Sequence, residues 1–98
     1  MLIKIHKSYR NIVAICDFEL LNKKFEEGKF QLDVKENFFN GEKVSEEKLV
    51  EIIKEMSLED STFNIIGEKA TNTAIKSGII SVTQIKKIAG IPFALVLI

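Results

Sequence analysis

Few side chains in this sequence are suited to acid–base or nucleophilic chemistry. The 98 residues include one histidine, His6, and one cysteine, Cys16. A catalytic nucleophile usually needs a neighbouring base and a third group that orients that base. Cys16 ends an apolar run, which is typical of a buried packing thiol, and His6 sits among lysines, which is typical of an exposed strand edge. We therefore expect no enzymatic activity, and the spacing of His, Cys, Asp and Glu predicts neither a metal site nor a cofactor.

A glycine turn in the second half of the chain is the nearest approach to an anion site. Gly67 follows a predicted strand and Glu68 begins a predicted helix, whose free N–H groups could hold a phosphate. Glu68 places a negative charge at that point, however, and one glycine is far from a phosphate-binding fingerprint. We expect Asn64, Gly67 and Glu68 to form a structural turn, braced by Asn64. The alternative is an enzyme acting on a nucleotide or an RNA end, if these three residues open onto a cleft.

Basic and aromatic residues near the N-terminus suggest contacts with RNA. Lysine and arginine neutralise phosphates, and aromatic rings stack on unpaired bases. The candidate RNA-binding residues are Lys4, His6, Lys7, Tyr9, Arg10, Phe39, Lys86 and Lys87. The alternatives are structural. The N-terminal cluster would then be a solvated hairpin tip, Phe39 would make a local packing contact, and Lys86 and Lys87 would lie on the solvent-exposed side of a helical segment.

The formal net charge is zero, but the charges are unevenly spread. Residues 1–30 carry +2, residues 31–60 carry −5 and residues 61–98 carry +3. If the fold brings the two ends together, a cationic face results that the zero net charge conceals. A neutral chain also suits a protein–protein adaptor or a homodimer that uses an uncovered strand edge or the Phe39 side. These two partner classes, structured RNA or a ribosome and another protein, are the leading hypotheses.

Length and composition indicate one small globular domain spanning residues 1–98. The chain is 46% hydrophobic and 29% charged, which is ordinary for a packed domain. No apolar run approaches the roughly 20 residues needed to cross a bilayer, so no membrane contact is expected. A single cysteine excludes an internal disulfide and fits a cytoplasmic location.

Hydrophobic periodicity predicts an α+β fold. We expect a mixed or antiparallel sheet of about five to six strands, covered by about three helices. The predicted strands are 2–6, 12–16, 30–34, 62–66 and 91–98, with 42–44 pairing back after an Asn40-Gly41 turn. The predicted helices are 17–28 with Asp17 as its cap, 45–57, 68–77 and a short segment from Ser81 through Ile88. The last strand carries no charge, which predicts burial on both faces, and Pro92 should delay its pairing to Phe93.

Several short segments together resemble a small archaeal family catalogued as domain of unknown function 424. The matching segments are Ile12-Val13-Ala14-Ile15-Cys16-Asp17, Glu19-Leu20-Leu21, Phe38-Phe39-Asn40-Gly41, Asn64-Ile65-Ile66-Gly67-Glu68-Lys69-Ala70 and Gly90-Ile91-Pro92-Phe93-Ala94. The resemblance implies a cytosolic archaeal protein without assigned activity, associated with translation, for which RNA binding has been suggested.

This chain departs from the family pattern after its proline. Relatives commonly have histidine where this chain has Phe93, and the turn usually written Phe-Tyr is Phe38-Phe39 here. If that histidine were a catalytic base in relatives, this chain would lack it. The departure therefore favours packing or recognition at this position, and it also allows that an activity has been lost.

Overall fold

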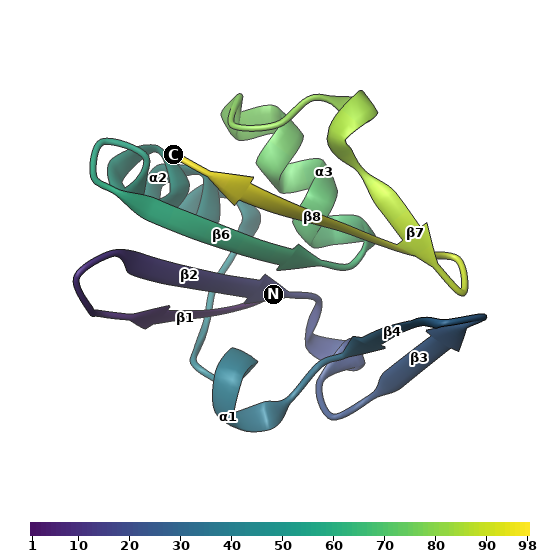
Figure 1. Ribbon diagram of the computed structural model, residues 1–98. Helices are drawn as coiled ribbons and strands as arrows, with labels where there is room; N and C mark the ends of the chain where they lie inside the picture. Colours follow the sequence, from purple (N-terminus) through teal and green to yellow (C-terminus); the bar gives the residue numbers. More distant parts are fainter.

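A six-stranded mixed sheet forms the centre of the molecule. The computed structural model describes residues 1–98, and the strand order is β5-β1-β2-β6-β8-β7 (Figure 1). The strands are β1 (Leu2–His6), β2 (Asn11–Cys16), β5 (Glu42–Lys43), β6 (Ser61–Ile66), β7 (Lys86–Ile88) and β8 (Ile91–Leu97). Only β2 and β6 pair in parallel. The predicted α+β class with about six strands is confirmed.

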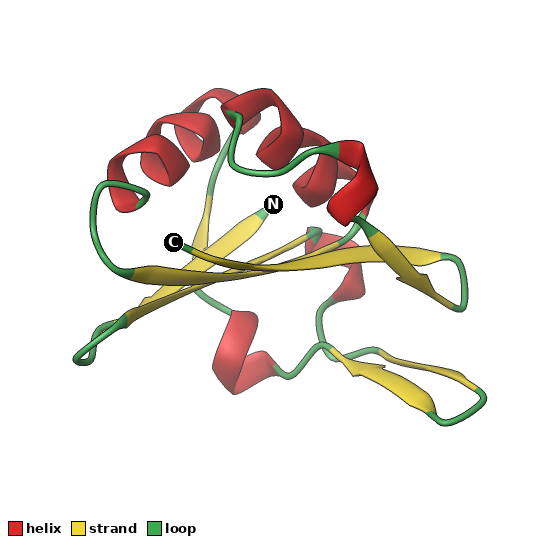
Figure 2. Cartoon of the chain, turned by 45° about the horizontal axis from the view of Figure 1, so that its top comes forward, coloured by secondary structure: helices red, strands yellow, loops and turns green.

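Two long helices cover one face of this sheet, and smaller elements cover part of the other. The helices are α2 (Glu46–Met56) and α3 (Glu68–Ser77), both on the same side (Figure 2). The opposite side carries the hairpin of β3 (Lys24–Glu27) and β4 (Phe30–Asp33), the one-turn helix α1 (Glu36–Phe39) and the 3₁₀ turn η1 (Phe18–Leu20). A second 3₁₀ turn, η2 (Val82–Gln84), precedes β7. None of these helices combines the length and the apolar character that a bilayer crossing requires.

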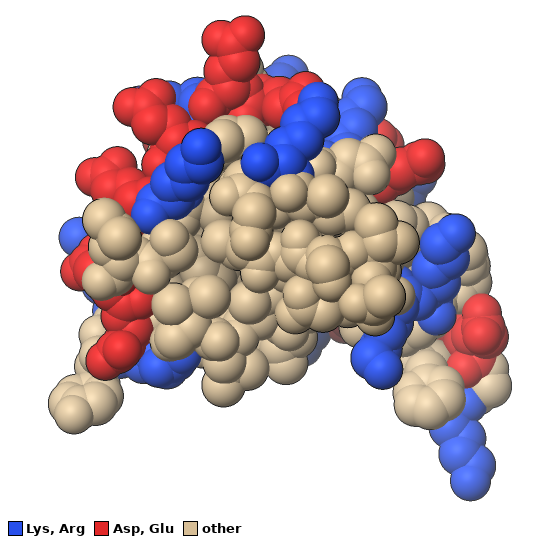
Figure 3. Space-filling model, turned by 90° about the horizontal axis from the view of Figure 1, so that it is seen from above, with Lys and Arg blue, Asp and Glu red and all other residues tan.

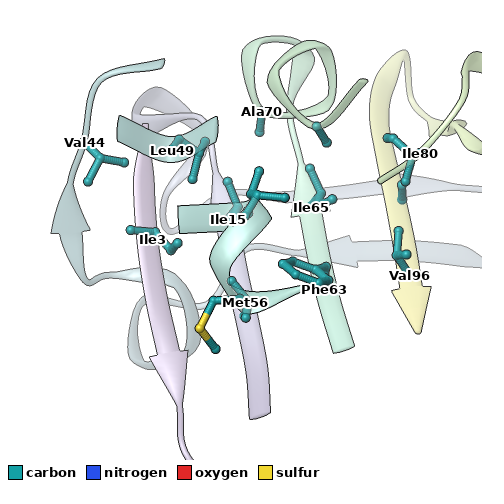
Figure 4. Packing of buried hydrophobic residues seen from close by; sticks show 14 residues of the cluster. Ile3, Ile15, Val44, Leu49, Met56, Phe63, Ile65, Ala70, Ile80 and Val96 are labelled. Atoms are coloured by element: carbon teal, nitrogen blue, oxygen red, sulfur yellow. The ribbon is translucent and has the colours of Figure 1, made fainter. Parts of the chain in front are cut away.

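The main core lies between the sheet and the two long helices. Ile15 and Phe63 on the central strands are fully buried, as are Leu49 and Ile53 of α2 (Figure 4). Alternate residues of each strand point to opposite faces, so the helix-facing residues form one apolar layer. A smaller cluster that includes Cys16 holds the β3–β4 hairpin and α1 against the other face. The sheet is therefore buried on both sides at one end only.

Most of the locally encoded boundaries match the sequence-based expectations. The hairpin of β1 and β2, the strand at 61–66 and the helix at 68–77 are all present. Ser45 caps α2 by accepting a hydrogen bond from the Lys48 amide at 3.2 Å. Gly78 ends α3 in the left-handed conformation with φ of +88°.

The helix predicted from Asp17 to Gly28 is wrong. The chain forms only the η1 turn and then the strand β3, in which Phe25 pairs with Leu32 of β4. Gly28 has φ of +59° and closes the hairpin rather than ending a helix. The apolar spacing was compatible with a helix, but pairing with the following strand brings Phe25 onto the second cluster.

The turn predicted at Asn40-Gly41 does not lead back to the preceding strand. Residues 36–39 are helical, and β5 pairs with β1 instead of β4. A Cβ at Gly41 would collide with the carbonyl oxygen of Ile3 and lie 2.9 Å from the Cβ of Lys4. The glycine is therefore required by close packing against β1, a contact between segments far apart in the sequence.

Two expectations for the C-terminal third are also corrected. The Ser81 capping box is present, but it opens only η2, and residues 86–88 form a strand instead of continuing a helix. Pairing in β8 begins before Phe93, because the Pro92 carbonyl accepts a hydrogen bond from the Gly67 amide at 2.8 Å. Pro92 has no N–H to donate to the carbonyl oxygen of Gly67 across the ladder. That oxygen instead accepts from the Thr71 amide, so no backbone acceptor is left without a partner.

The closing strand is buried on one face only. Ala94 and Val96 point into the main core, whereas Leu95 and Leu97 are 60% and 68% exposed. The prediction that this uncharged strand is buried on both faces is therefore wrong, and an apolar strip is left open.

Candidate functional site

The part of the sheet that no element covers is the candidate functional surface. The strand pairing aligns two rows of side chains on the face opposite α2 and α3. These rows are Lys4, Ala14, Asn64 and Leu95, and His6, Ile12, Thr62 and Leu97. Ala14 is buried in the second cluster, and the other seven side chains are partly or well exposed. We call this surface the open sheet face. It is bounded at one side by α1 and at one end by the β3–β4 hairpin (Figure 1).

A hollow of about 610 Å³ lies where the open sheet face meets α1 and β4. Its polar lining includes His6, Asp33, Lys35 and Asn64, and its apolar wall includes Phe38. No hydrogen bond within the protein engages the Asn64 carboxamide or the Asp33 carboxylate. A half-apolar hollow with a few free polar groups is the usual form of a site for a small polar ring system.

His6 and Lys4 hold α1 in place. The Nε2 atom of His6 lies 2.9 Å from the carbonyl oxygen of Phe38, and the two rings stack with centroids 4.8 Å apart. Because a carbonyl only accepts, Nε2 carries the proton in this contact. Lys4 Nζ donates to the carbonyl oxygen of Asn37 at 2.8 Å. His6 is therefore half-buried and braces the wall of the hollow, rather than lying at an exposed strand edge.

Two residues proposed for RNA contact have other roles. Phe39 is only 4% exposed and packs in the second cluster, so its ring is closed to a base. Arg10 Nε donates to Thr62 Oγ1 at 2.9 Å, and its guanidinium also donates to the Ser61 and Ile98 carbonyls. Arg10 therefore ties the β1–β2 hairpin to β6 and to the C-terminal residue. No local sequence pattern indicates these distant partners.

The remaining basic candidates divide between the two faces. Lys86 lies beside Phe93 on the open side, because these two residues are cross-strand partners, and Lys87 points the other way. Lys7 and Tyr9 are exposed at the tip of the β1–β2 hairpin. Lys43, which the sequence did not single out, shares the open side with its partner Leu2, and its Nζ lies 4.6 Å from the centroid of the Phe18 ring.

Asn64, Gly67 and Glu68 do not form one site. Asn64 faces the hollow from the middle of β6, whereas Gly67 and Glu68 begin α3 at the end of that strand. The Asp17 carboxylate already occupies the start of α3, where it accepts from the Lys69 amide at 3.1 Å and the Ala70 amide at 2.8 Å. Gly67 joins β6 to α3 without any bracing hydrogen bond from Asn64, and an anion at this turn would meet the negative charge of Asp17.

Cys16 is fully buried at the end of β2. Burial raises the pKa of its thiol from 9.0 to about 11, and the nearby Asp17 adds to this effect. A thiol with so high a pKa stays protonated at neutral pH and is a poor nucleophile.

This pKa predicts how stability depends on pH. Between pH 9 and 11 the unfolded thiol loses its proton before the folded one, so the free energy of unfolding should fall by about 1 kcal/mol per pH unit. Urea titrations at several pH values would measure the fall. The matched comparison is with Cys16→Ala, whose curve should be flatter by that amount. Equal slopes for both proteins would contradict the buried, protonated thiol.

The fold recurs in an archaeal protein, described as an uncharacterized conserved protein from Methanopyrus kandleri. The two structures superpose with a TM-score of 0.90 at 22% identity, over 99% of this chain and 90% of that chain. At this identity the likeness concerns the fold alone. None of the curated proteins compared with this sequence matches it. The profile of the protein family of unknown function DUF424 matches residues 6–98, and the chain therefore belongs to that family.

Proposed function

We propose that this protein is a non-catalytic RNA- or ribonucleoprotein-binding module of the archaeal translation apparatus, and that RNA lies across the open sheet face. One observation supports this most directly: every charged side chain that the six-stranded sheet places on that side is basic. These residues are Lys4, Lys43 and Lys86. Neutralisation of phosphates by lysine supplies most sequence-independent affinity for nucleic acid.

The acidic residues of the long helix do not oppose this binding mode. Glu47, Glu51 and Glu55 belong to α2, which covers the opposite face of the sheet. Figure 3 shows acidic side chains along the helical side of the molecule, with basic side chains among them. On the open side the strands of the six-stranded sheet contribute only lysines, and the acidic residues there belong to the β3–β4 hairpin and α1, so a chain of zero net charge still presents a row of basic residues to a polyanion.

The hollow beside α1 would accept one unpaired base. Its volume of about 610 Å³ exceeds what a base needs, and Phe38 supplies an apolar wall. The free carboxamide of Asn64 offers one acceptor and two donors for the edge of that base. Phosphates would follow the lysines, and Tyr9 at the hairpin tip would stack on a second base.

Removal of the three sheet lysines tests this proposal. The triple variant Lys4→Gln, Lys43→Gln and Lys86→Gln should bind single-stranded RNA more weakly. Its affinity should also depend less steeply on salt, with the negative slope of log K against log salt reduced in magnitude by about 2. Fluorescence anisotropy with an oligonucleotide, transfer RNA and ribosomal RNA fragments, over a salt series, measures both quantities.

The matched control changes three lysines on the helical side. Lys48→Gln, Lys54→Gln and Lys87→Gln remove the same charge, and Lys87 is the neighbour of Lys86 that points to the other face. Equal losses in both triple variants would show unspecific electrostatic attraction and would contradict the assigned face. No binding by the unaltered protein at low salt would remove the proposal altogether. Because Lys4 also holds α1, thermal unfolding should accompany these measurements.

The second candidate function is a protein–protein adaptor or a homodimeric structural protein. The specific observation in its favour is the unpaired outer edge of β8, where an exposed apolar strip carries no charge.

A further inference from the structure

The outer edge of β8 is free over its second half. On one side, β8 pairs with β6 from Phe93 to Leu97. On the other side, β7 pairs only with Ile91, Pro92 and Phe93. Beyond Phe93 no strand lies on the outer side of β8, away from β6. A free sheet edge of this kind is a ready template for another strand.

The backbone groups that face outward belong to Leu95 and Leu97. The Ile98 amide donates to the Ser61 carbonyl at 2.9 Å, and the Pro92 carbonyl accepts from the Gly67 amide, so even-numbered residues turn their backbone groups toward β6. In an antiparallel ladder the intervening residues turn theirs to the other side. None of the turn, loop or cap hydrogen bonds involves Leu95 or Leu97. Two N–H groups and two carbonyls are thus presented at this edge.

The usual protections of a sheet edge are missing here. Natural edges are blunted by lysine, proline, bulges or covering segments, yet residues 94–97 are Ala-Leu-Val-Leu. The segment that includes Ile80 packs beside Val96 on the helical face and leaves the leucines uncovered (Figure 4). Figure 3 looks onto the side of the molecule where β8 lies in Figure 1, and it shows a broad surface without charge. Leu95 and Leu97 are more than half exposed within this strip.

We propose that this edge binds a second copy of the same chain, through antiparallel pairing of β8 with β8 of the partner. A two-fold axis at Val96 places Leu95 opposite the partner's Leu97, and Leu97 opposite the partner's Leu95. Both are residues with outward backbone groups, so the pairing makes four N–H···O hydrogen bonds. The two sheets join into one, and four leucine side chains cluster on its open side.

A second copy fits this edge because the strand is complementary to itself. The two-fold pairing sets Leu95 against the partner's Leu97 at both symmetry-related positions, and residues 94–97 bring no charged side chain to the interface. The formal net charge of zero means that two copies do not repel one another at long range. The open sheet faces of both copies would lie on the same side of the joined sheet, so dimerisation does not depend on RNA binding and does not obstruct it.

The oligomeric state without RNA tests the proposal. Sedimentation equilibrium from micromolar to millimolar protein should show a monomer–dimer equilibrium. Leu95→Lys should raise the dissociation constant roughly 100-fold, since a charge is brought against leucine at both symmetry-related sites. The matched control is Leu58→Lys, because Leu58 is 86% exposed and belongs to the turn between α2 and β6, not to the edge of β8. It should leave the constant within about threefold.

A compensating substitution tests the register. In the double variant Leu95→Lys with Leu97→Glu, the introduced lysine of each copy lies opposite the introduced glutamate of the other, so dimerisation should recover by at least about tenfold over Leu95→Lys alone. Amide hydrogen exchange gives a second readout: Leu95 and Leu97 should gain protection as protein concentration rises, whereas Val96, bonded to β6, should be protected throughout. A monomer at every concentration, a dimer indifferent to Leu95→Lys, or unprotected leucine amides in the dimer would each overturn the proposal.

Discussion

Replacement of Gly67 by alanine is expected to lower the free energy of unfolding by about 3–5 kcal/mol. Gly67 has φ of +115°, a conformation that L-residues with a side chain rarely adopt. A Cβ at this position would also lie 2.6 and 2.7 Å from the two carboxylate oxygens of Asp17. The methyl group would push the carboxylate away from the start of α3, so strain and loss of the cap add together. Urea unfolding followed by circular dichroism measures the effect.

Gly28 provides the control for backbone strain alone. It has φ of +59°, and a Cβ there would meet nothing within 4 Å. Gly28→Ala should therefore cost only about 1 kcal/mol, the penalty for alanine in the left-handed region. If Gly67→Ala were no more destabilising than Gly28→Ala, the close approach of Asp17 to Gly67 would be contradicted.

Asp17→Ala is expected to cost about 2–4 kcal/mol. The carboxylate is buried, and it accepts hydrogen bonds from the amides of Lys69 and Ala70, two of the free donors at the start of α3. Its removal leaves both donors without partners and detaches the helix start from the end of β2. Asp17→Asn should be intermediate, because an amide oxygen still accepts from one of the donors. Equilibrium unfolding in urea compares the three proteins.

The two substitutions should not be additive. In the Asp17→Ala background, the methyl group added at position 67 no longer meets a carboxylate. The double variant should therefore be more stable than the sum of the single effects predicts, by at least about 1 kcal/mol. A double-mutant cycle measures this coupling, and an additive result would mean that the two positions act independently.

Elements whose signals lie within a few residues could be predicted from the sequence. Ser45 caps the helix that follows it, Gly78 ends the helix that precedes it, and the alternation of residues 2–6 indicates a half-covered strand. In each case the residue that gives the signal and the backbone group that it satisfies are near neighbours. No tertiary information was needed.

Elements whose partners are distant could not be placed. Asp17 has the character of a helix cap, and it does cap a helix, but that helix is α3, whose Lys69 amide lies 52 residues further along the chain. Asp17 is recognisable from the sequence as a capping residue, but the prediction placed it at the start of the nearest apolar repeat, residues 17–28. Likewise β5 pairs with β1, and Gly41 is required by contact with Ile3, which no local pattern reveals.

The sequence predicts that basic residues form the candidate surface, but it does not predict all of the residues that belong to it. Lys4, His6 and Lys86 do share one side of the sheet, because β1 and β7 both place alternate residues there. Lys43 and Asp33 were missed, since their positions depend on pairing between separate strands. Phe39 is the candidate named from the sequence, and a strand would have turned Phe38 and Phe39 to opposite faces. Both residues instead lie on a helical turn, where Phe38 faces the hollow.

The anchoring of α1 leaves the side chains beside it open to exchange in this protein. Lys4 and His6 bind the carbonyl oxygens of Asn37 and Phe38, groups that every residue type possesses. The side chain at position 37 can therefore be exchanged while the tether to its carbonyl stays intact. A library randomised at residue 37 and at its lining neighbour Lys35 would vary the chemistry of the hollow on a constant scaffold. Selection from such a library offers a route to new recognition properties without redesign of the sheet.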